Sequence, residues 1–403
     1  MTKQEIISTA YKVWGKEFYQ KTSLSRLAQE LGVSKSALYR HFKSKQTLLD
    51  AMYENYFDDY TNFIKPHYEK AVSAENRIEK VSIMIRAITE YYILRIEAFI
   101  FSLVKVYDSQ YMEKSLKEFA IRGVNMRKFF REDLVYPTLS QLIIGNLFFV
   151  IGFFHKTSTE TPTEKTVDRL VFFLEKNVSF GLGMSNEIIE KLDYKTLEAK
   201  IEKRNYTEVN NDHIFKAVAL AIAEAGPADC SMDMVAKLSG LSKSSLYFYF
   251  KNKQDMLEQA FISELNRILD YTKEAISWSS VPEEQLYQAM FSIAHYLRAR
   301  PEILRAADWM RIRRLELNVS IPPEFFKIFS GVNMNFSKRD NKFVYEQIER
   351  MILFLIVHTL LRRPEGMDFQ DVPNESIRRL FCFIALGIHS SAFDYDYDLE
   401  QRI

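Results

Sequence analysis

The chain has 403 residues and a formal net charge of +1, which is enough length for two or three ordinary domains. Its two cysteines, Cys230 and Cys382, form no CxxC pair, and no secretory signal precedes them. We therefore expect the protein to reside in a reducing cytoplasm. The longest apolar stretches, residues 142–154 and 351–361, are too short to cross a bilayer. The seven histidines form no HxxxH pair, and no Gly-rich phosphate loop or GxSxG motif occurs, so we expect no enzyme, metal or cofactor.

The first predicted elements form a helix-turn-helix within residues 22–49. Ser23 is expected to cap a short helix with apolar residues at helical spacing. Gly32 supplies the left-handed residue that ends this helix. Ser34 then caps a second helix over residues 35–42. Two short helices joined by such a turn are typical of a DNA-binding element.

The outer face of the second helix carries the residues that we expect to contact DNA. Leu38 and Phe42 lie four residues apart and are expected to face inward. Short polar and basic side chains on the opposite face can reach base edges and phosphates in a major groove. Lys45 stands near the start of the next helix, where main-chain amides also favour phosphate. The candidate DNA-binding residues here are Thr22, Ser23, Ser34, Lys35, Ser36, Tyr39, Arg40, His41 and Lys45.

Beyond this segment the pattern is helical, with few glycines and prolines and no sustained period of two. The sequence therefore predicts an all-α fold without strands. Two apolar helices are expected late in the first half, over residues 137–155 and 163–180. The charged stretch over residues 185–205 has a loose apolar stripe and is predicted to form one helix, about 30 Å long for about 20 residues. A flexible charged linker is the alternative.

The helix-turn-helix then occurs a second time. Residues 230–257 match residues 22–49 at a constant offset of 208 without a gap, and 13 of the 28 positions are identical. A repeat of this length is about one domain, so it indicates domain duplication. The late helix pair also recurs, over residues 341–361 and 374–390. The candidate DNA-binding residues of the second copy are Ser231, Ser242, Lys243, Ser244, Tyr247, Phe248, Tyr249 and Lys253.

The two copies differ in charge. The first head, residues 1–50, contains nine Lys or Arg and four acids, which gives +5. The second head, residues 209–258, contains five Lys or Arg and six acids, which gives −1. In the second head Phe248 replaces Arg40, Tyr249 replaces His41 and Asp233 replaces Ser25. Either the second head recognises a different half-site by apolar contacts, for instance with thymine methyls, or it has partly lost DNA binding.

The stretches GVSKSALYRHFKSKQTLL and GLSKSSLYFYFKNKQDML both resemble the signature of the tetracycline-repressor (TetR/AcrR) family of bacterial transcription regulators. The resemblance covers roughly residues 3–55 and 211–263. It implies that Tyr39, Lys45, Tyr247 and Lys253 contact the DNA backbone and that a helical regulatory domain follows each head. The expected domains are a first head at 1–50, a regulatory domain at 51–183, a linker at 184–208, a second head at 209–258 and a second regulatory domain at 259–403.

The resemblance also implies partners. The family dimerises through the late helices as a four-helix bundle, so this chain is expected to act as a monomeric pseudo-dimer on a double-stranded DNA operator with two half-sites. The aromatic middle helices suggest a small apolar or amphipathic effector, although such aromatics are usually core. Candidate ligand-binding residues are Tyr92, Gln141, Asn146, His155, His295, Tyr296 and His358. The expected function is a ligand-responsive repressor; the alternative is an architectural or protein-interaction factor that binds DNA without an effector.

Overall fold

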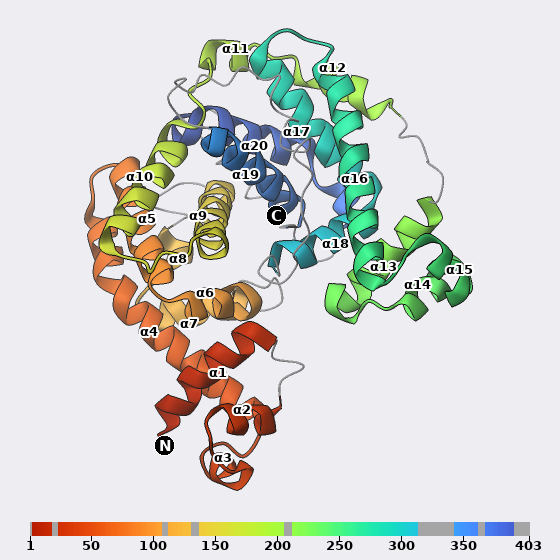
Figure 1. The fold of residues 1–403 in the computed structure, drawn as a ribbon. Helices are drawn as coiled ribbons and strands as arrows, with labels where there is room; N and C mark the ends of the chain where they lie inside the picture. The colour runs from red at the N-terminus through yellow and green to blue at the C-terminus, as the bar shows by residue number, and fades with distance from the viewer. Residues whose placement is uncertain are drawn as a thin grey trace. The chain divides into compact units, whose positions relative to one another are not determined.

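The computed structural model describes residues 2–17, 23–106, 112–129, 137–204, 212–312, 342–361 and 367–390. Within these ranges the chain is helical and contains no strand, as predicted (Figure 1). The chain divides into two compact units. Unit 1 comprises Met1–Ser140 and Ile151–Glu175, and unit 2 comprises Gln141–Val150 and Lys176–Ile403. None of the described helices is long and apolar enough to cross a membrane.

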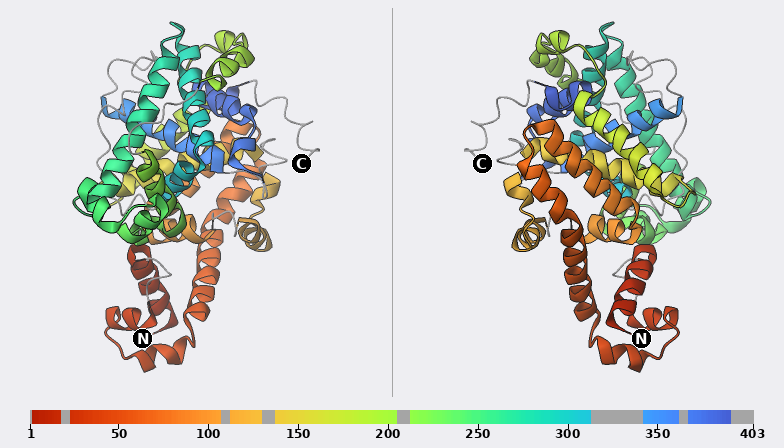
Figure 2. Two further views of the ribbon diagram at one scale, coloured as in Figure 1. Left: turned by 90° about the vertical axis from the view of Figure 1, so that its right-hand side faces the viewer. Right: turned by 90° about the vertical axis from the view of Figure 1, so that its left-hand side faces the viewer.

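Unit 1 begins with three short helices at one end of the long helix α4 (Figure 2). Helix α4 packs along α5, and aromatic side chains fill the space between them. The fully buried large aromatics of this core are Tyr56, Tyr60, Tyr91, Tyr92, Phe99, Phe119 and Phe129. The helices are α1 (Lys3–Glu17), α2 (Leu24–Glu30), α3 (Lys35–His41), α4 (Lys45–Ser73), α5 (Arg77–Ile93), α6 (Ile96–Phe101), α7 (Met112–Ile121) and α8 (Met126–Lys128), and a π-helix at Ser102–Val106 follows α6.

Helices α9 (Pro137–Thr157) and α10 (Glu164–Phe180) are the late pair of the first half. Part of each belongs to each unit, since the unit boundaries fall within both helices. In unit 1, Arg86 of α5 donates to the Asp168 carboxylate of α10 at 2.8 Å and 2.5 Å. Both helices begin close to where the sequence predicts, near Pro137 and Thr163.

Unit 2 contains the second copy of the helix-turn-helix and of the helices that follow it. Helix α13 packs along α18, and α16 packs along α17. Gly226, at φ 78°, interrupts α13 shortly before its end, in a conformation that suits glycine. The helices are α11 (Asn186–Glu190), α12 (Tyr194–Glu202), α13 (Asp212–Asp229), α14 (Met232–Ser239), α15 (Lys243–Tyr249), α16 (Lys253–Ile276), α17 (Pro282–Ala299), α18 (Pro301–Ile312), α19 (Lys342–Leu361) and α20 (Asn374–Leu386).

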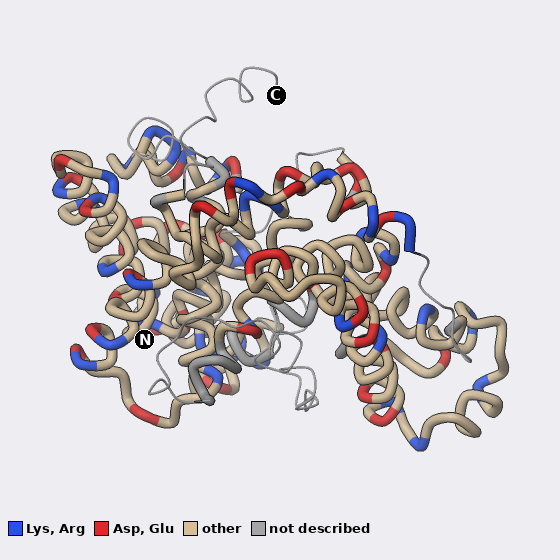
Figure 3. Tube along the Cα trace, turned by 90° about the horizontal axis from the view of Figure 1, so that it is seen from above, with Lys and Arg blue, Asp and Glu red and all other residues tan. Residues whose placement is uncertain are grey.

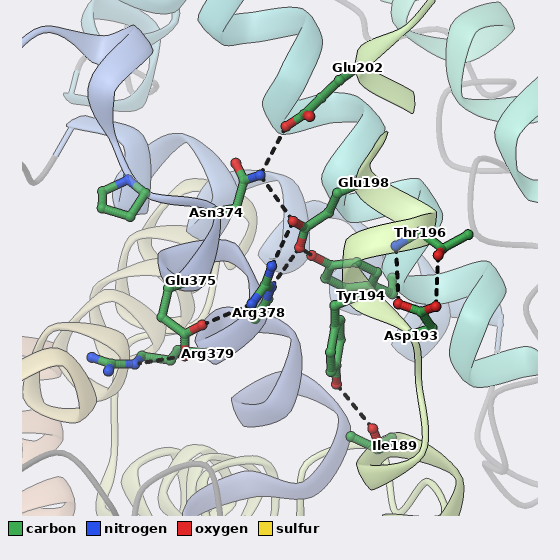
Figure 4. Close-up of polar contacts among 12 residues, drawn as sticks. Ile189, Asp193, Tyr194, Thr196, Glu198, Glu202, Asn374, Glu375, Arg378 and Arg379 are labelled. Atoms are coloured by element: carbon green, nitrogen blue, oxygen red, sulfur yellow. Dashed lines mark hydrogen bonds and ion pairs between the residues drawn. The ribbon is translucent and has the colours of Figure 1, made fainter. Parts of the chain in front are cut away.

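The prediction of a single helix over residues 185–205 is wrong. The segment forms α11 and α12, because the Asp193 side chain accepts the Thr196 amide at 3.1 Å and so caps a new helix. Glu198 of α12 is buried, where it accepts two hydrogen bonds from Arg378 of α20, at 2.6 Å and 2.7 Å, and one from Tyr287 of α17 at 2.5 Å (Figure 4). Burial is the largest single influence on this carboxyl and would raise its pKa, but the hydrogen bonds from Arg378, Tyr287 and Asn374, together with the charge of Arg378, outweigh it and hold the pKa below its usual value.

Helix α12 is attached to α16 as well. The Arg204 guanidinium, just beyond α12, lies 3.9 Å from the centroid of the Tyr271 ring and donates to the Tyr271 carbonyl at 2.8 Å. Lys200 lies 4.0 Å from the Trp278 ring centroid. Up to Arg204 the connection between the two halves is therefore helical and packed on α16 and α17 of the second half.

Inside unit 2, residues of the first half pack on the late helices of the second half. A Cβ atom on Gly145 of α9 would lie 2.9 Å from a methyl of Leu355 in α19, so the glycine permits a close approach. After α10 the backbone amides of Leu182 and Met184 donate to the carbonyls of Ile384 and Ala385, at 2.8 Å and 3.1 Å. These bonds fix the end of the first half against α20.

Candidate nucleic-acid interface

The first head is a complete helix-turn-helix. The Ser23 hydroxyl accepts the Arg26 amide at 3.2 Å and caps α2, and Gly32, at φ 65°, occupies the turn after it. The Ser34 hydroxyl accepts the Ala37 amide at 3.2 Å and caps α3. Leu38 is fully buried and holds α3 against the head. The predicted caps and turn are confirmed, while Thr22 lies outside the described residues.

Helix α3 exposes the predicted face. Lys35, Ser36, Tyr39 and Arg40 are exposed, and His41 is half-buried. The Lys35 ammonium lies 5.7 Å from the centroid of the Tyr39 ring, so the two side chains share one surface. A cation and a phenol hydroxyl side by side suit a phosphate-lined groove.

The start of α4 carries a second candidate phosphate-binding element in the first head. The Ser44 hydroxyl accepts the Thr47 amide at 3.1 Å, and the Thr47 hydroxyl accepts the Ser44 amide at 3.1 Å, which forms a capping box. Both capping side chains are neutral, so the positive end of the helix is left without a counter-charge. Lys45 is half-buried at this end of the helix. Burial lowers the pKa of Lys45, and the charge of the nearby Lys105 lowers it further.

The second head repeats this construction with its own core. Ser231 caps α14 through the Met234 amide at 3.2 Å, and Ser242 caps α15 through the Ser245 amide at 3.0 Å. Gly240, at φ 71°, ends α14. The buried core of this head contains Ile214, Ala217, Val218, Ala221, Cys230, Met232, Val235, Ala236, Leu246, Phe250, Met256, Leu257 and Ala260. The second head is therefore a folded head and not a remnant of one.

The second head has carboxylates, Asp233 and Asp255, at two positions where the first head has neutral side chains. Lys243, the counterpart of Lys35, donates to Asp233 at 2.7 Å, and this hydrogen bond raises the pKa of the lysine. Asp255 stands where the first head has Thr47, and it accepts the Lys251 amide at 2.8 Å at the start of α16. Hydrogen bonds from Gln259 and then from that amide lower the pKa of Asp255, so it is ionised at neutral pH. Both signs of charge are scattered over the described helices, between longer uncharged stretches (Figure 3).

Aromatic side chains replace cations on the outer face of α15. Tyr247, Phe248 and Tyr249 are all exposed, and Phe248 is 90% exposed. The corresponding residues of α3 are Tyr39, Arg40 and His41. The two heads thus present the same backbone geometry with different chemistry.

The predicted effector-binding residues of unit 1 lie in its aromatic core. Tyr92 is fully buried, and its hydroxyl lies 2.6 Å from the hydroxyl of Tyr56. His155 lies 2.9 Å from the Tyr92 carbonyl through Nε2, which must donate because a carbonyl only accepts. Burial lowers the pKa of His155 below its ordinary value. These residues form one connected polar group inside an apolar region.

The remaining candidates lie in unit 2 and are not equivalent. Gln141 is exposed, because its position on α9 turns it away from the apolar stripe, so it does not line an interior site. Asn146 and His358 are buried. His295 shares a 2.9 Å hydrogen bond with the hydroxyl of Tyr271. Tyr296 is buried and donates to the Glu264 carboxylate at 2.7 Å.

Sequence reasoning missed three elements that shape these sites. The Ser44 capping box and the Asp255 carboxylate could have been found from their spacing, since a capping residue followed three positions later by a polar partner marks a helix start. The buried pair of Glu264 and Arg300, 3.3 Å apart, had no local signal in the sequence.

The two cysteines, Cys230 and Cys382, are buried and carry free thiols. Burial raises the pKa of both thiols to about 11, so they remain protonated at neutral pH. Among the described residues no cluster of His, Cys, Asp or Glu could hold a metal ion.

Comparison with protein families finds the same two segments. The model for "Bacterial regulatory proteins, tetR family" matches residues 6–52 and again residues 214–260. Both matches coincide with the helix-turn-helix elements described above. The family consists of transcription regulators, and not of enzymes.

Individual relatives match over shorter stretches. The chain is 29% identical over 83 residues to the uncharacterized HTH-type transcriptional regulator YhgD of Bacillus subtilis, which covers 21% of this chain and 44% of the relative. It is 30% identical over 73 residues to the fatty acid metabolism regulator protein of Bacillus subtilis, covering 18% and 38%. Among solved structures, the chain is similar to the TetR family transcriptional regulator PfmR from Thermus thermophilus, with 20% sequence identity and a TM-score of 0.32. The match covers 42% of this chain and 95% of PfmR. The chain thus spans less than half the length of these two curated relatives.

Proposed function

Because the chain belongs to the tetR family of bacterial regulatory proteins and carries the family's DNA-binding head twice, we propose that it is a ligand-responsive repressor that acts as a single-chain pseudo-dimer. The observation that carries the proposal is the pair of complete helix-turn-helix elements, each with a capped recognition helix and an exposed face. Two heads in one chain supply what a family dimer obtains from two chains, so one molecule suffices for an operator with two half-sites.

The contacts inside unit 2 support the pseudo-dimer. Residues of the first half, at Gly145 and after α10, pack on α19 and α20 of the second half. The rings of Phe149 and Phe354 lie 5.5 Å apart, between centroids. A tethered partner is present at an effective concentration in the millimolar range for a linker of suitable length, so association within one chain is favoured over association between chains.

Two glycines that follow α10 offer a matched test of this packing. Both have a left-handed backbone, at φ 54° for Gly181 and φ 66° for Gly183. A Cβ atom on Gly181 would lie 2.5 Å from the backbone oxygen of Ile384, whereas nothing lies within 4 Å of one on Gly183. Gly181→Ala therefore strains the contact with α20 as well as the local backbone, and Gly183→Ala strains the backbone alone.

The experiment measures the mass of the full chain by light scattering, free and bound to an operator, together with the DNase footprint. We expect the mass of one chain and protection of two successive major grooves on one DNA face. Gly181→Ala is expected to shorten the footprint or weaken binding more than Gly183→Ala. An obligate assembly of two chains, held through α10 against its own copy, would refute the pseudo-dimer.

The effector is proposed to be a small apolar or amphipathic molecule that binds between the middle helices of at least one half. Tyr92 and His155 in unit 1, and His295 and Tyr296 in unit 2, support this, because a small-molecule site combines apolar walls with a few polar groups that orient the ligand. Binding would release DNA if it favours a head spacing unsuited to successive grooves, with a coupling of about 1–3 kcal/mol.

Fatty acyl compounds are the first effectors to test, because one relative is named a fatty acid metabolism regulator protein. Thermal unfolding of the full chain with a metabolite library that includes acyl chains of several lengths should show a rise in Tm for the effector, and the same compound should lower affinity for the operator. If no compound shifts Tm while operator binding is intact, the protein is a DNA-binding architectural factor without an effector.

A further inference from the structure

The side chain at the outermost position of the second recognition helix is Phe248. Leu246 of α15 is fully buried, and a residue two positions later lies about 200° around the helix, so Phe248 points away from the core of the head. It has the largest exposed fraction of the large apolar side chains in the described part of the chain. In the first head Arg40 holds this position.

The helix that carries Phe248 is capped at its start and packed into the core of the second head. The Ser242 cap fixes the start of α15, and Leu246 and Phe250 anchor it in the core of the second head. The neighbouring ring of Tyr249 lies 6.0 Å away, between centroids, in an edge-on arrangement. Phe248 therefore lies on the outer face of the recognition helix, the helix that enters the major groove in this type of element.

The surroundings of Phe248 have lost charge but kept the other groups of the DNA-binding motif. Lys243 is paired with Asp233, and Asp255 places a negative charge at the start of α16. Tyr247, Ser244 and Lys251 remain exposed at the motif positions. Weak attraction to phosphate combined with an intact outer face favours discrimination between sequences over general affinity.

We propose that Phe248 recognises thymine in the second half-site, by apolar contact with the C5-methyl group in the major groove. This inference rests on the proposed function of the chain as a two-headed DNA-binding regulator. Thymine is the base that presents a methyl group in that groove, and phenylalanine is among the side chains that contact it. Arg40 of the first head has the geometry to contact O6 and N7 of guanine instead. The operator is therefore asymmetric, with guanine in one half-site and thymine at the equivalent position of the other.

The low affinity expected of the second head does not prevent this recognition. The first head, at +5, binds phosphate and holds the chain on DNA, so the second head meets its half-site at a high local concentration. Each half of the operator then contributes differently, with affinity mainly from the first head and additional specificity from the second.

The test begins with a pool of random DNA duplexes, from which the full-length protein selects bound sequences. Single thymines of the selected operator are then replaced by deoxyuridine, which lacks only the C5-methyl group. For the native chain we expect at least one thymine in the second half-site at which this replacement lowers affinity about fourfold, the factor that corresponds to burial of one methyl-sized group. In Phe248→Ala the same replacement should have no effect.

Two further variants separate the outcomes. Phe248→Arg is expected to select guanine at that position, and Arg40→Ala is expected to change the first half-site while leaving the deoxyuridine effect intact. Because Phe248 is exposed, none of its substitutions should alter Tm. If no duplex is enriched, the proposed function itself fails. If duplexes are enriched but no deoxyuridine effect depends on Phe248, or only one half-site is selected, the inference is overturned, and the aromatic face then belongs to a protein contact.

Discussion

Helices α4 and α16 are equivalent in the two copies, and each begins at a lysine of the repeated motif. The side chains that they bury at equivalent positions, however, differ in chemistry. Tyr56 of α4 lies in an uncharged cluster, with its hydroxyl 2.6 Å from that of Tyr92. At the equivalent position, 208 residues later, α16 has Glu264, which accepts from Tyr296 at 2.7 Å and lies 3.3 Å from Arg300. The two copies share these helices but differ in the side chains that the helices bury.

The difference shows what each half can tolerate. A buried carboxylate requires partners, and Glu264 finds them in Tyr296, Arg300 and Arg267, the last at 3.1 Å. The tyrosine hydroxyls of unit 1 are neutral, so they require hydrogen-bond partners but no counter-charge. The two halves therefore bury different polar groups, and under the proposed function a ligand that suits one half has no reason to suit the other.

The largest expected effect follows from removing the buried carboxylate. Glu264→Ala removes the carboxylate of α16 from Arg300, which keeps Glu302 at 3.5 Å as a second partner, so we expect a loss of about 3 kcal/mol in the stability of unit 2. Tyr56→Phe removes one neutral hydrogen bond in unit 1 and should cost about 1 kcal/mol. Hydrogen exchange with mass spectrometry measures each unit separately. Equal losses of protection in the two units would contradict the proposed contrast between their cores.

The sequence predicts the parts of this molecule that depend on local rules. Serine caps, Gly32, the inward Leu38 and the late helix pairs follow from spacing and backbone preference, and the structure has them. The division of residues 185–205 into two helices depends on one cap, at Asp193, that competes with helix continuation. Its outcome depends on tertiary contacts, because Glu198 of the second short helix is held by Arg378, 180 residues later.

The candidate sites divide in the same way. The exposed faces of α3 and α15 follow from helical periodicity, so their residues were predicted together. The pairing of Lys243 with Asp233 joins two helices, so the charge difference could be counted from the sequence whereas the contact could not. Gln141 shows the reverse problem, since apolar neighbours in sequence suggested burial whereas its helical position leaves it exposed.

An intermediate effect is expected from matched substitutions in the two heads. Arg40→Ala should weaken operator binding by about 1–3 kcal/mol if it contacts a base, and Lys35→Ala should lower the salt slope by about one unit. Lys243→Ala should change both quantities less, because Asp233 already neutralises this lysine. Fluorescence anisotropy at several salt concentrations measures them.

The control for the heads is Asp233→Ser, which restores the residue of the first head at this position. It should free Lys243 to reach phosphate, raise the affinity and steepen the salt slope. Equal losses from Lys35→Ala and Lys243→Ala would show that the ion pair with Asp233 opens on DNA at no cost. The asymmetry between the heads would then have to be abandoned.

The smallest effect concerns a feature that the two halves share, a partly buried histidine. Burial lowers the pKa of His155 in unit 1 and of His295 in unit 2. Each is therefore neutral in the folded protein, and the unfolded chain binds protons more readily. Their contribution to stability is complete above the unfolded pKa of about 6.5 and is lost as the pH falls through the lower folded value.

His155→Gln keeps a donor for the Tyr92 carbonyl, and His295→Asn keeps a polar partner for Tyr271, but neither variant titrates in this range. The fall in Tm between pH 7 and pH 5 should therefore be smaller in each variant than in the native chain, and the two reductions should add because the residues lie in separate units. Burial is the largest cause of both shifts. After it, the hydrogen bond to the Tyr92 carbonyl and the charge of Glu97 oppose the shift at His155, and Glu202 opposes the shift at His295 while Arg298 and Arg204 reinforce it. Identical pH profiles for the native chain and both variants would show that neither histidine is linked to folding.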